Sequence, residues 1–407
     1  MKILFIHQNF PGQFVHVAPA LAARGHQVVA LGVEGGRPAL PQVPHILHAP
    51  DAAQPDLQAP AGPLKEWSAK LARARSCAQA MERLQAQGFV PDVVFAHPGW
   101  GEALHVKDVF PGCRFLIYGE YYYGKEGGDT DFDPEFPSPP GWPGQAKLRL
   151  KNTHLLHAMA AADGGLSPTH FQKSRHPEWF QPRIEVIHDG IETGRFVPGP
   201  GQSVRLAQAG ITLRAGDEVV TFVARQLEPY RGYHTFMRAL PLLQRLRPQA
   251  HVVIVGGNSV AYGAAAPAGQ SWRQIFLDEV RERLDLQRVH FVGTLPHAVL
   301  TQLLQVSAVH TYLTYPFVLS WSMLEALSIG CLIVGSRTAP VEEVIEDGRN
   351  GFLVDFFDAD ALARRIAEVL DNRQALAHVR HAARQTALEY DLSTRCLPGW
   401  VRFVEGG

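Results

Sequence analysis

Residues 218–236 read EVVTFVARQLEPYRGYHTF and decide the expected fold. The apolar run at their start is typical of a buried strand, and the stretch from Gly232 to about Leu246 predicts a helix. Two arginines, Arg225 and Arg231, lie in the turn between strand and helix. Because a guanidinium group is costly to bury without an anion, this turn predicts an anion-binding site at the strand end.

The same alternation of strand and helix patterns recurs along the chain. In the first half, strand-like runs occur at 2–6, 26–32, 91–97, 113–120, 162–168 and 183–190. In the second half they occur at 218–225, 251–257, 289–293, 308–313 and 331–336. Short apolar strands that alternate with helices are typical of parallel sheets. We therefore expect an α/β fold with two Rossmann-like, doubly wound parallel-sheet domains.

The Pro- and Gly-rich segment VPGPGQSV (197–204) is the best candidate for a linker. It divides the chain into a first domain, residues 1–198, and a second domain, residues 199–387. The loop 124–144 is dense in Pro, Gly and Asp, and we expect it either to cover the mouth of a cleft or to be disordered.

Composition excludes several function classes. The chain has 407 residues, with 38 Lys and Arg against 39 Asp and Glu, so no basic stripe points to a nucleic-acid partner. Its four cysteines are scattered without metal-type spacing, which favours reduced thiols and a cytoplasmic location. The N-terminus lacks a cleavage site, and no apolar run approaches the ~18 residues of a membrane span, so we expect neither a signal peptide nor a spanning helix.

Further polar residues follow predicted strands, where open α/β sheets bind their ligands. Ser320 and Ser322 lie at the expected start of a helix with Glu325 one turn in, which fits either phosphate and ribose binding or simple capping. His97 ends the strand PDVVFAH and precedes Glu102. The segment GEYYYG brings Glu120 and Tyr121, which could line an acceptor site or pack.

Several segments, in chain order, resemble the retaining glycosyltransferases of family 4, which have the GT-B fold. VARQLEPYRGYHTF resembles their G-R-L-x-x-x-K-G segment, and VHFVGTLPHAVL their base-binding strand and loop. PFVLSWSMLEALSIGC resembles their E-x7-E region, and SRTAPVEEVIEDGRNGFLV their glycine-rich tail. IEVIHDGIETGRF, FPGQFVHVAPALAARGHQV and STRCLPGWVRFVE are similar to the interdomain link, the N-terminal Gly-loop with its helix, and the last helix.

This resemblance implies the GT-B architecture, two domains facing across a cleft, with a C-terminal helix (388–407) that returns to the first domain. It also implies residue roles. Arg225 and Arg231 would clamp the donor diphosphate, Arg231 standing where the family usually has Lys, and His97 would support the transition state. The remaining donor-site candidates are Gly12, Val292, Gly293, Leu295, Phe317, Ser320, Trp321, Ser322 and Glu325, with Glu325 on the ribose.

One residue departs from the family pattern. Phe317 occupies the position of the family's first Glu, seven residues before Glu325, and an aromatic ring cannot accept hydrogen bonds from sugar hydroxyls. Two hypotheses remain open: the donor is a deoxysugar with an apolar face, or another acid replaces the contact.

Two segments admit a second interpretation. DTDFD (129–133) contains D-x-D patterns that can hold a metal, but we expect a solvated acidic turn, no metal and no cofactor. KLRLKNTHLLHAM (147–159) is typical of a surface helix, and peripheral contact with an anionic membrane is the alternative.

The function implied is a metal-independent, retaining glycosyltransferase that moves a hexosyl or deoxyhexosyl group. Its donor would be a nucleotide-diphosphate sugar, and its acceptor a glycan, a lipid-linked molecule or a small molecule. A nucleotide-sugar epimerase or a glycosyl phosphorylase would reuse the same fold. A non-catalytic nucleotide-sugar binding protein, suggested by Phe317, is the alternative of another class.

Overall fold

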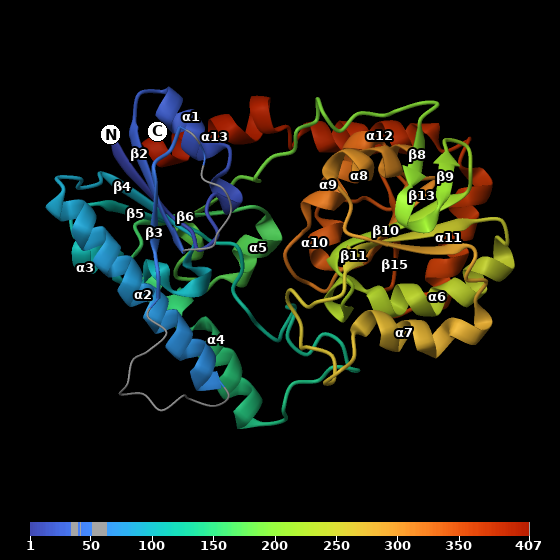
Figure 1. Cartoon of the computed structure of the whole chain (residues 1–407), viewed down its shortest axis with the longest axis horizontal. Coiled ribbons are helices and arrows are strands. Elements are labelled where there is room, and N and C mark those ends of the chain that lie inside the picture. The colour runs from blue at the N-terminus through green and yellow to red at the C-terminus, as the bar shows by residue number, and fades with distance from the viewer. Residues whose placement is uncertain (34–39, 41, 51–62, 407) are drawn as a thin grey trace. The chain divides into compact units, whose positions relative to one another are not determined.

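The computed structural model describes residues 1–33, 40, 42–50 and 63–406 (Figure 1). The chain forms two compact units, residues 1–190 with 393–407, and residues 191–392. The first unit thus ends eight residues before the boundary expected at 198, and the chain re-enters the first unit at residue 393. Residues 191–196 join the second unit because Ile191 and Phe196 are buried in its hydrophobic core. Ile191 also exchanges backbone hydrogen bonds with Tyr390 and Leu392.

The first unit is built on a seven-stranded sheet with the order β3-β2-β1-β4-β5-β6-β7. All neighbouring strands in it are parallel. The strands are β1 Lys2–Ile6, β2 Gln27–Val33, β3 His45–His48, β4 Val93–Ala96, β5 Arg114–Tyr118, β6 Gly164–Ser167 and β7 Ile184–Val186. The expected doubly wound parallel fold is confirmed, although β3 was missed.

Helices cover both faces of this sheet (Figure 1). They are α1 Val17–Ala23, α2 Pro63–Ala86, α3 Val106–Val109, α4 Trp142–Ala161, α5 His170–Arg175 and α13 Leu397–Glu405. Along β1, Ile3 and Phe5 pack with α1 and α13, while Leu4 and Ile6 pack with α2 and α4. Strand side chains alternate between faces, so both faces must be apolar, which explains why these strands read as continuous apolar runs.

The second unit repeats this plan with a six-stranded sheet in the order β12-β11-β10-β13-β14-β15, also parallel throughout. The strands are β10 Val219–Gln226, β11 His251–Gly257, β12 Val289–Gly293, β13 Val309–Tyr312, β14 Ile333–Ser336 and β15 Phe352–Val354. The helices are α6 Tyr233–Leu246, α7 Trp272–Val280, α8 His297–Val306, α9 Trp321–Ile329, α10 Ala339–Glu342, α11 Ala359–Asn372 and α12 Ala377–Leu388. The strand–turn–helix expected at 218–246 is confirmed as β10 and α6.

A small antiparallel hairpin of β8 Ser203–Leu206 and β9 Ile211–Arg214 stands at the end of the expected linker. Val204, Leu206 and Leu213 are buried in the core of the second unit, while Arg205 and Thr212 are exposed. This alternation is the signature of a strand with one buried face, and the Pro and Gly residues before it masked the signal.

Both sheets have a switch point where strand order reverses. It lies between β1 and β4 in the first unit and between β10 and β13 in the second. The loops that leave the carboxyl ends of such a pair diverge to opposite faces and open a crevice, which is where ligands bind in this architecture. His97 follows β4 and Arg225 lies at the end of β10, so each sequence candidate stands at the switch point of its own unit.

We expect Trp400→Ala to lower the free energy of unfolding by about 3–5 kcal/mol, the usual cost of a large aromatic truncation in a core. Trp400 of α13 is 2% exposed, packs on Phe14 and Phe95, and donates from Nε1 to the carbonyl oxygen of His188 at 3.0 Å. The measurement is urea denaturation followed by circular dichroism. Trp142→Ala is the control, since Trp142 is 77% exposed; equal losses in the two variants would contradict the packing.

Candidate functional site

At the switch point of the first unit, two histidines lie side by side. His7 follows β1 and His97 follows β4, and their ring centroids are 5.2 Å apart. His97 is 4% exposed and stacks on Trp100 at 4.4 Å. Its Nδ1 accepts a hydrogen bond from the backbone N–H of Gly99 at 3.1 Å. This bond requires a neutral ring with its proton on Nε2.

A chain of polar groups connects these histidines. The Nε2 of His7 lies 2.8 Å from Oε1 of Gln13, whose amide nitrogen donates to Oε1 of Glu120 at 2.9 Å. The other oxygen of Glu120 lies 3.4 Å from Nε2 of His97. Glu120 therefore faces the Nε2 side of His97, although this nitrogen makes no hydrogen bond within the described residues. Gln13 was missed by the sequence reading, although it lies in the quoted Gly-loop.

Gly12 keeps this cluster together. Its φ is +49°, a left-handed conformation that favours glycine, and a Cβ there would lie 2.2 Å from Nε2 of His7. Gly12 is among the donor-site candidates predicted from the sequence, where a glycine would let the loop approach the substrate closely. In the structure the close approach is to His7.

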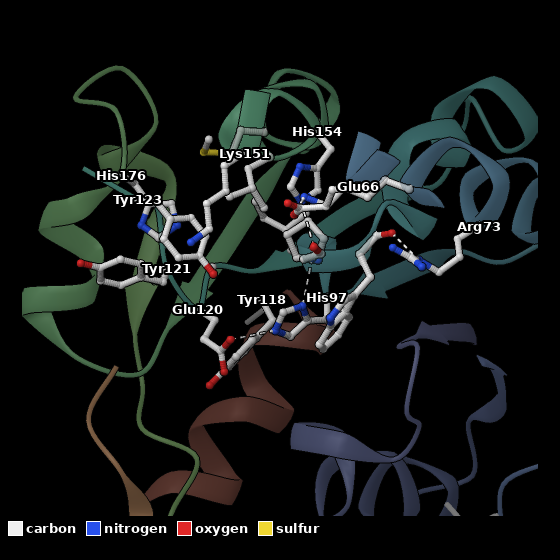
Figure 2. Close-up of a pocket in the computed structure, with 18 residues that line it drawn as sticks. Glu66, Arg73, His97, Tyr118, Glu120, Tyr121, Tyr123, Lys151, His154 and His176 are labelled. Atoms are coloured by element: carbon white, nitrogen blue, oxygen red, sulfur yellow. Dashed lines mark hydrogen bonds and ion pairs between the residues drawn. The ribbon is translucent and has the colours of Figure 1, made fainter. Parts of the chain in front are cut away.

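A cavity of about 280 Å³ opens beside His97 (Figure 2). His97, Glu120 and Tyr121 line it, so three sequence candidates meet on one wall. Tyr121 is 5% exposed, its hydroxyl accepts from the backbone N–H of Asp129 at 3.3 Å, and burial raises its pKa. Tyr121 therefore contributes to the cavity wall mainly through packing.

The rest of the cavity wall was missed by sequence reasoning. Helix α2 supplies Glu66, Lys70 and Arg73, and helix α4 supplies Lys151 and His154. His154 donates from Nε2 to the carbonyl oxygen of Gly99 at 2.8 Å, and burial lowers its pKa to about 4, so the ring is neutral at pH 7. In the sequence, only the spacing of Lys151 and His154 could have pointed to this wall, because residues three apart lie on the same face of a helix.

Glu102 lies at the start of the short helical segment Glu102–His105 and is fully buried. Neither carboxylate oxygen has a hydrogen-bond partner among the described residues. Burial raises the pKa of this carboxyl, and the nearby positive charge of Arg73 offsets only part of that effect. Glu102 does not line the cavity, so its part in an acceptor site remains a hypothesis.

In the second unit, Arg225 and Arg231 occupy different environments. Arg225 is exposed at the end of β10, and its guanidinium makes no hydrogen bond or ion pair within the described parts of the chain. Arg231 is 6% exposed and donates to Oγ1 of Thr314 and the carbonyl oxygen of Val318, both at 2.9 Å. The pair expected from the sequence is therefore one available cation and one that is held in place.

Three neighbours keep Arg231 charged. Burial opposes its charge, but the hydroxyls of Tyr312 and Tyr262 and the carboxylate of Glu228 outweigh burial, and its pKa is raised. Glu228 is itself fully buried and accepts from the backbone N–H groups of Ala261, Tyr262 and Gly263 at 3.1–3.3 Å. Glu228 therefore fixes the loop after β11. Its position within the stretch 218–236 did not predict this role.

Phe317 belongs to an aromatic cluster next to Arg231. Its ring is 3% exposed, with centroids 5.4 Å from Tyr230 and 5.0 Å from Tyr262. The Arg231 guanidinium lies 5.9 Å from the Phe317 ring and 5.1 Å from the Tyr262 ring. An apolar, cation-binding wall therefore stands where the family usually places a carboxylate.

The start of α9 is as expected from the sequence. Ser320 is its N-cap, and its Oγ accepts from the backbone N–H of Ser322 at 3.4 Å. Trp321 is 41% exposed. Glu325 is 7% exposed with Oε1 3.3 Å from Nε2 of His297, and burial raises its pKa despite that histidine.

The predicted base-binding segment ends β12. Val292 and Leu295 are buried, whereas Gly293 is exposed with a φ of +63°, which leaves the backbone of this turn open to solvent.

In the first unit, the acidic turn 129–133 is held in place by its own carboxylates. Asp131 pairs with Lys125 at 2.5 Å, and Lys125 and Ser138 together lower the pKa of Asp131 to about 2.

Within the described residues, no helix is both long and apolar enough to cross a membrane.

Two family models match the chain, and together they reach from residue 24 to residue 386. The first is described as glycosyl transferase family 4 group (24–196), the second as glycosyl transferases group 1 (205–386). The chain belongs to the family 4 glycosyltransferases. The GT-B fold follows from the two parallel-sheet units and from solved structures of similar fold. The Anabaena Alr3699/HepE complex with UDP matches with a TM-score of 0.67, 18% identity and full coverage of both chains. Sucrose-phosphate synthase from Thermosynechococcus elongatus matches with a TM-score of 0.72 and 16% identity, over 100% of this chain and 98% of that one.

Curated relatives of this chain are distant. A D-inositol 3-phosphate glycosyltransferase of Streptomyces avermitilis is 25% identical over 57% of this chain and 49% of its own length. A GDP-mannose-dependent alpha-(1-6)-phosphatidylinositol monomannoside mannosyltransferase of Mycolicibacterium smegmatis is 26% identical over 61% of this chain and 63% of its own. The chain thus spans about half to two thirds of these two relatives. A glycogen synthase of Mycobacterium tuberculosis is 26% identical over 95% of this chain and 90% of its own length.

We expect Glu102→Gln to stabilise the folded protein increasingly as pH rises. A carboxyl whose pKa is raised in the folded state costs nothing below its unfolded pKa, near 4.5, where it is protonated in both states. Its penalty appears as pH rises through the interval between the unfolded and folded values. The measurement is the free energy of unfolding of both proteins from pH 4 to pH 8. Glu82→Gln, at an exposed position on α2, is the control, and a constant difference across this range would contradict the buried charge.

Proposed function

We propose that this chain transfers a sugar from a nucleotide-diphosphate sugar to an acceptor hydroxyl, with retention at the anomeric carbon and without a metal ion. The donor binds at the carboxyl ends of the second sheet and the acceptor at those of the first. The transferred group is a hexose or a deoxyhexose, and the acceptor is a glycan, a lipid-linked molecule or a small molecule.

The observation that carries this proposal is the exposed guanidinium of Arg225, which has no partner among the described residues and lies at the switch point between β10 and β13. A planar guanidinium fork matches the oxygens of a diphosphate. Arg231 adds a second positive charge whose position is fixed by Thr314 and Val318. The first turn of α9, capped by Ser320, adds backbone N–H groups and the positive end of a helix dipole.

In the proposed reaction, the bond between sugar and diphosphate breaks with both electrons leaving on the phosphate oxygen. Arg225 and Arg231 neutralise most of that charge, which is the role that a metal ion would otherwise have. The acceptor oxygen then attacks the same face of the sugar, which retains the configuration, and its proton passes to the departing phosphate oxygen. Electrostatic stabilisation of the leaving group is usually the largest single catalytic effect in such sites.

The remaining donor contacts are assigned by position. Glu325 binds the ribose, and the open backbone at Gly293, between Val292 and Leu295, binds the base. The Anabaena protein of similar fold was crystallised in complex with UDP, which supports a nucleotide ligand for this architecture. On the acceptor side, His97, whose Nδ1 accepts a hydrogen bond from Gly99, supplies a polar group next to the cavity.

Phe317 favours a donor sugar with an apolar face. The cluster of Phe317, Tyr230 and Tyr262 offers no carboxylate to sugar hydroxyls, so a deoxyhexose loses less on binding there than a hexose does.

We expect Arg225→Ala to lower kcat/KM for sugar transfer about 10²–10³-fold with no loss of folding stability, because Arg225 is exposed and has no hydrogen bond or ion pair to lose within the described chain. Arg231→Ala should lower both kcat/KM and folding stability, since it also removes hydrogen bonds to Thr314 and Val318. The measurement is nucleotide release from UDP-, GDP-, ADP- and dTDP-sugars, with and without EDTA. Arg245→Ala, exposed on α6, is the matched control. Full activity of Arg225→Ala would refute the clamp.

Incubation with donor alone separates this function from its alternatives. We expect NMR spectra of the donor sugar to stay unchanged until an acceptor is added, when free nucleotide appears. Interconversion of the sugar without an acceptor would indicate an epimerase. Tight donor binding with no nucleotide release under any acceptor would indicate the binding protein that Phe317 also allows.

A further inference from the structure

The cavity of the first unit carries more positive than negative charge. Three cations line it, Lys70, Arg73 and Lys151, against two carboxylates, Glu66 and Glu120, so the wall has a net charge of +1 (3 − 2). The histidines beside them, His154 and His176, have pKa values lowered by burial to about 4 and are neutral at pH 7. The excess charge is therefore carried by ammonium and guanidinium groups.

Each of the two carboxylates is already engaged. Glu66 pairs with Lys70 at 2.8 Å, and the Glu66 side chain is 60% exposed whereas that of Lys70 is 7% exposed. Glu120 accepts from Gln13 and faces His97. Arg73 donates from Nε to the carbonyl oxygen of Trp100 at 2.8 Å. Of the three cations, only Lys70 has a carboxylate partner in the described chain.

Lys151 is the cation whose charge is least compensated. Its ammonium group lies 3.4 Å from the centre of the Tyr123 ring and makes no hydrogen bond or ion pair within the described residues (Figure 2). Burial lowers its pKa, and the positive charges of Lys70 and Lys147 act in the same direction, against partial compensation by Asp129 and Glu66. A half-buried ammonium on an aromatic face, under the influence of other positive charges, is a position that an anion would stabilise.

The orientation of Lys151 is a property of the helix. Lys147, one turn earlier on α4, is exposed, whereas Lys151 turns into the cavity. The buried face of α4, which includes Asn152 and Leu155, sets this direction. No carboxylate in the described part of the first unit forms an ion pair with Lys151, so the Tyr123 ring is its one described contact partner.

We propose that this cavity binds the oxyanion, a phosphate or a carboxylate, of a monosaccharide-sized acceptor at the ammonium group of Lys151. The inference rests on the proposed function, because it names the acceptor class of the same enzyme. The volume of about 280 Å³ lies near the lower end of small-molecule sites, which suits one sugar or polyol ring. Tyr121 and Tyr123 supply flat walls for such a ring, and Glu120 accepts from its hydroxyls.

The test is calorimetric titration of the full chain with D-glucose 6-phosphate, D-glucuronate, D-glucose and inorganic phosphate. We expect a probe that carries an oxyanion to bind at least ~10-fold more tightly than D-glucose, a difference within reach of one buried ionic contact. Whichever of glucose 6-phosphate and glucuronate binds more tightly identifies the anion. Lys151→Met, which keeps an apolar stem over Tyr123, should remove the preference.

Lys147→Met is the matched control, since it removes the same charge from the same helix outside the cavity, and it should bind like the unmodified protein. Equal affinity for all four probes, no binding of any anion, or equal losses in the two variants would overturn the proposal. A measurement that needs no variant adds to it: in the unmodified protein, glucose 6-phosphate or glucuronate should protect Lys151, but not Lys147, from reductive methylation detected by mass spectrometry.

Titration with UDP, GDP, ADP and dTDP in the same experiment separates this inference from the proposed function. Anion binding that depends on Lys151, without binding of any of these nucleotides and without sugar transfer, would leave the cavity site standing and refute the glycosyltransferase reaction. Transfer to a neutral sugar, without any preference for an anion, would refute only the site.

Discussion

A parallel sheet covered on both faces leaves a chain few places for polar chemistry. In the first unit the strand residues Ile3 to Ile6 are fully buried, and the strands of the second unit are nearly as inaccessible. Polar groups must then gather where strands end, and the loops at the switch point provide the only pair of adjacent ends that diverge. The positions of His97 and Arg225 follow from this constraint.

The same constraint explains why charged groups in the second unit are held by backbone atoms. Arg231 and Glu228 are both nearly inaccessible, and each would be costly without partners. Arg231 uses a hydroxyl and a carbonyl oxygen after β13, and Glu228 uses three backbone N–H groups after β11. One short turn, 227–231, thereby ties together the loops that follow three neighbouring strands. Rigid positioning of this kind is what electrostatic catalysis requires.

Much of the fold could be read from the sequence, because apolar runs and their order determine the parallel strands. The position of Arg225 at the end of β10 and the cap at Ser320 followed from the same patterns. The part of the cavity wall that α2 and α4 supply could not be predicted from the sequence, because which side chains of a helix face inward depends on tertiary packing. Lys147 and Lys151 are alike in sequence and differ only in what surrounds them. Glu228 was hidden for the same reason, since its partners lie more than thirty residues away.

The return of α13 to the first unit has a consequence for synthesis of the protein. Trp400, Val401, Phe403 and Val404 complete a hydrophobic cluster that otherwise consists of residues from the first half of the chain. The ribosome makes roughly 200 residues of the second unit between these two parts, which takes on the order of 10–40 s at ~5–20 residues per second. During that interval the apolar surface awaiting α13, around Phe14 and Phe95, stays exposed on the nascent chain. Such a surface is a natural target for a chaperone that binds emerging polypeptides.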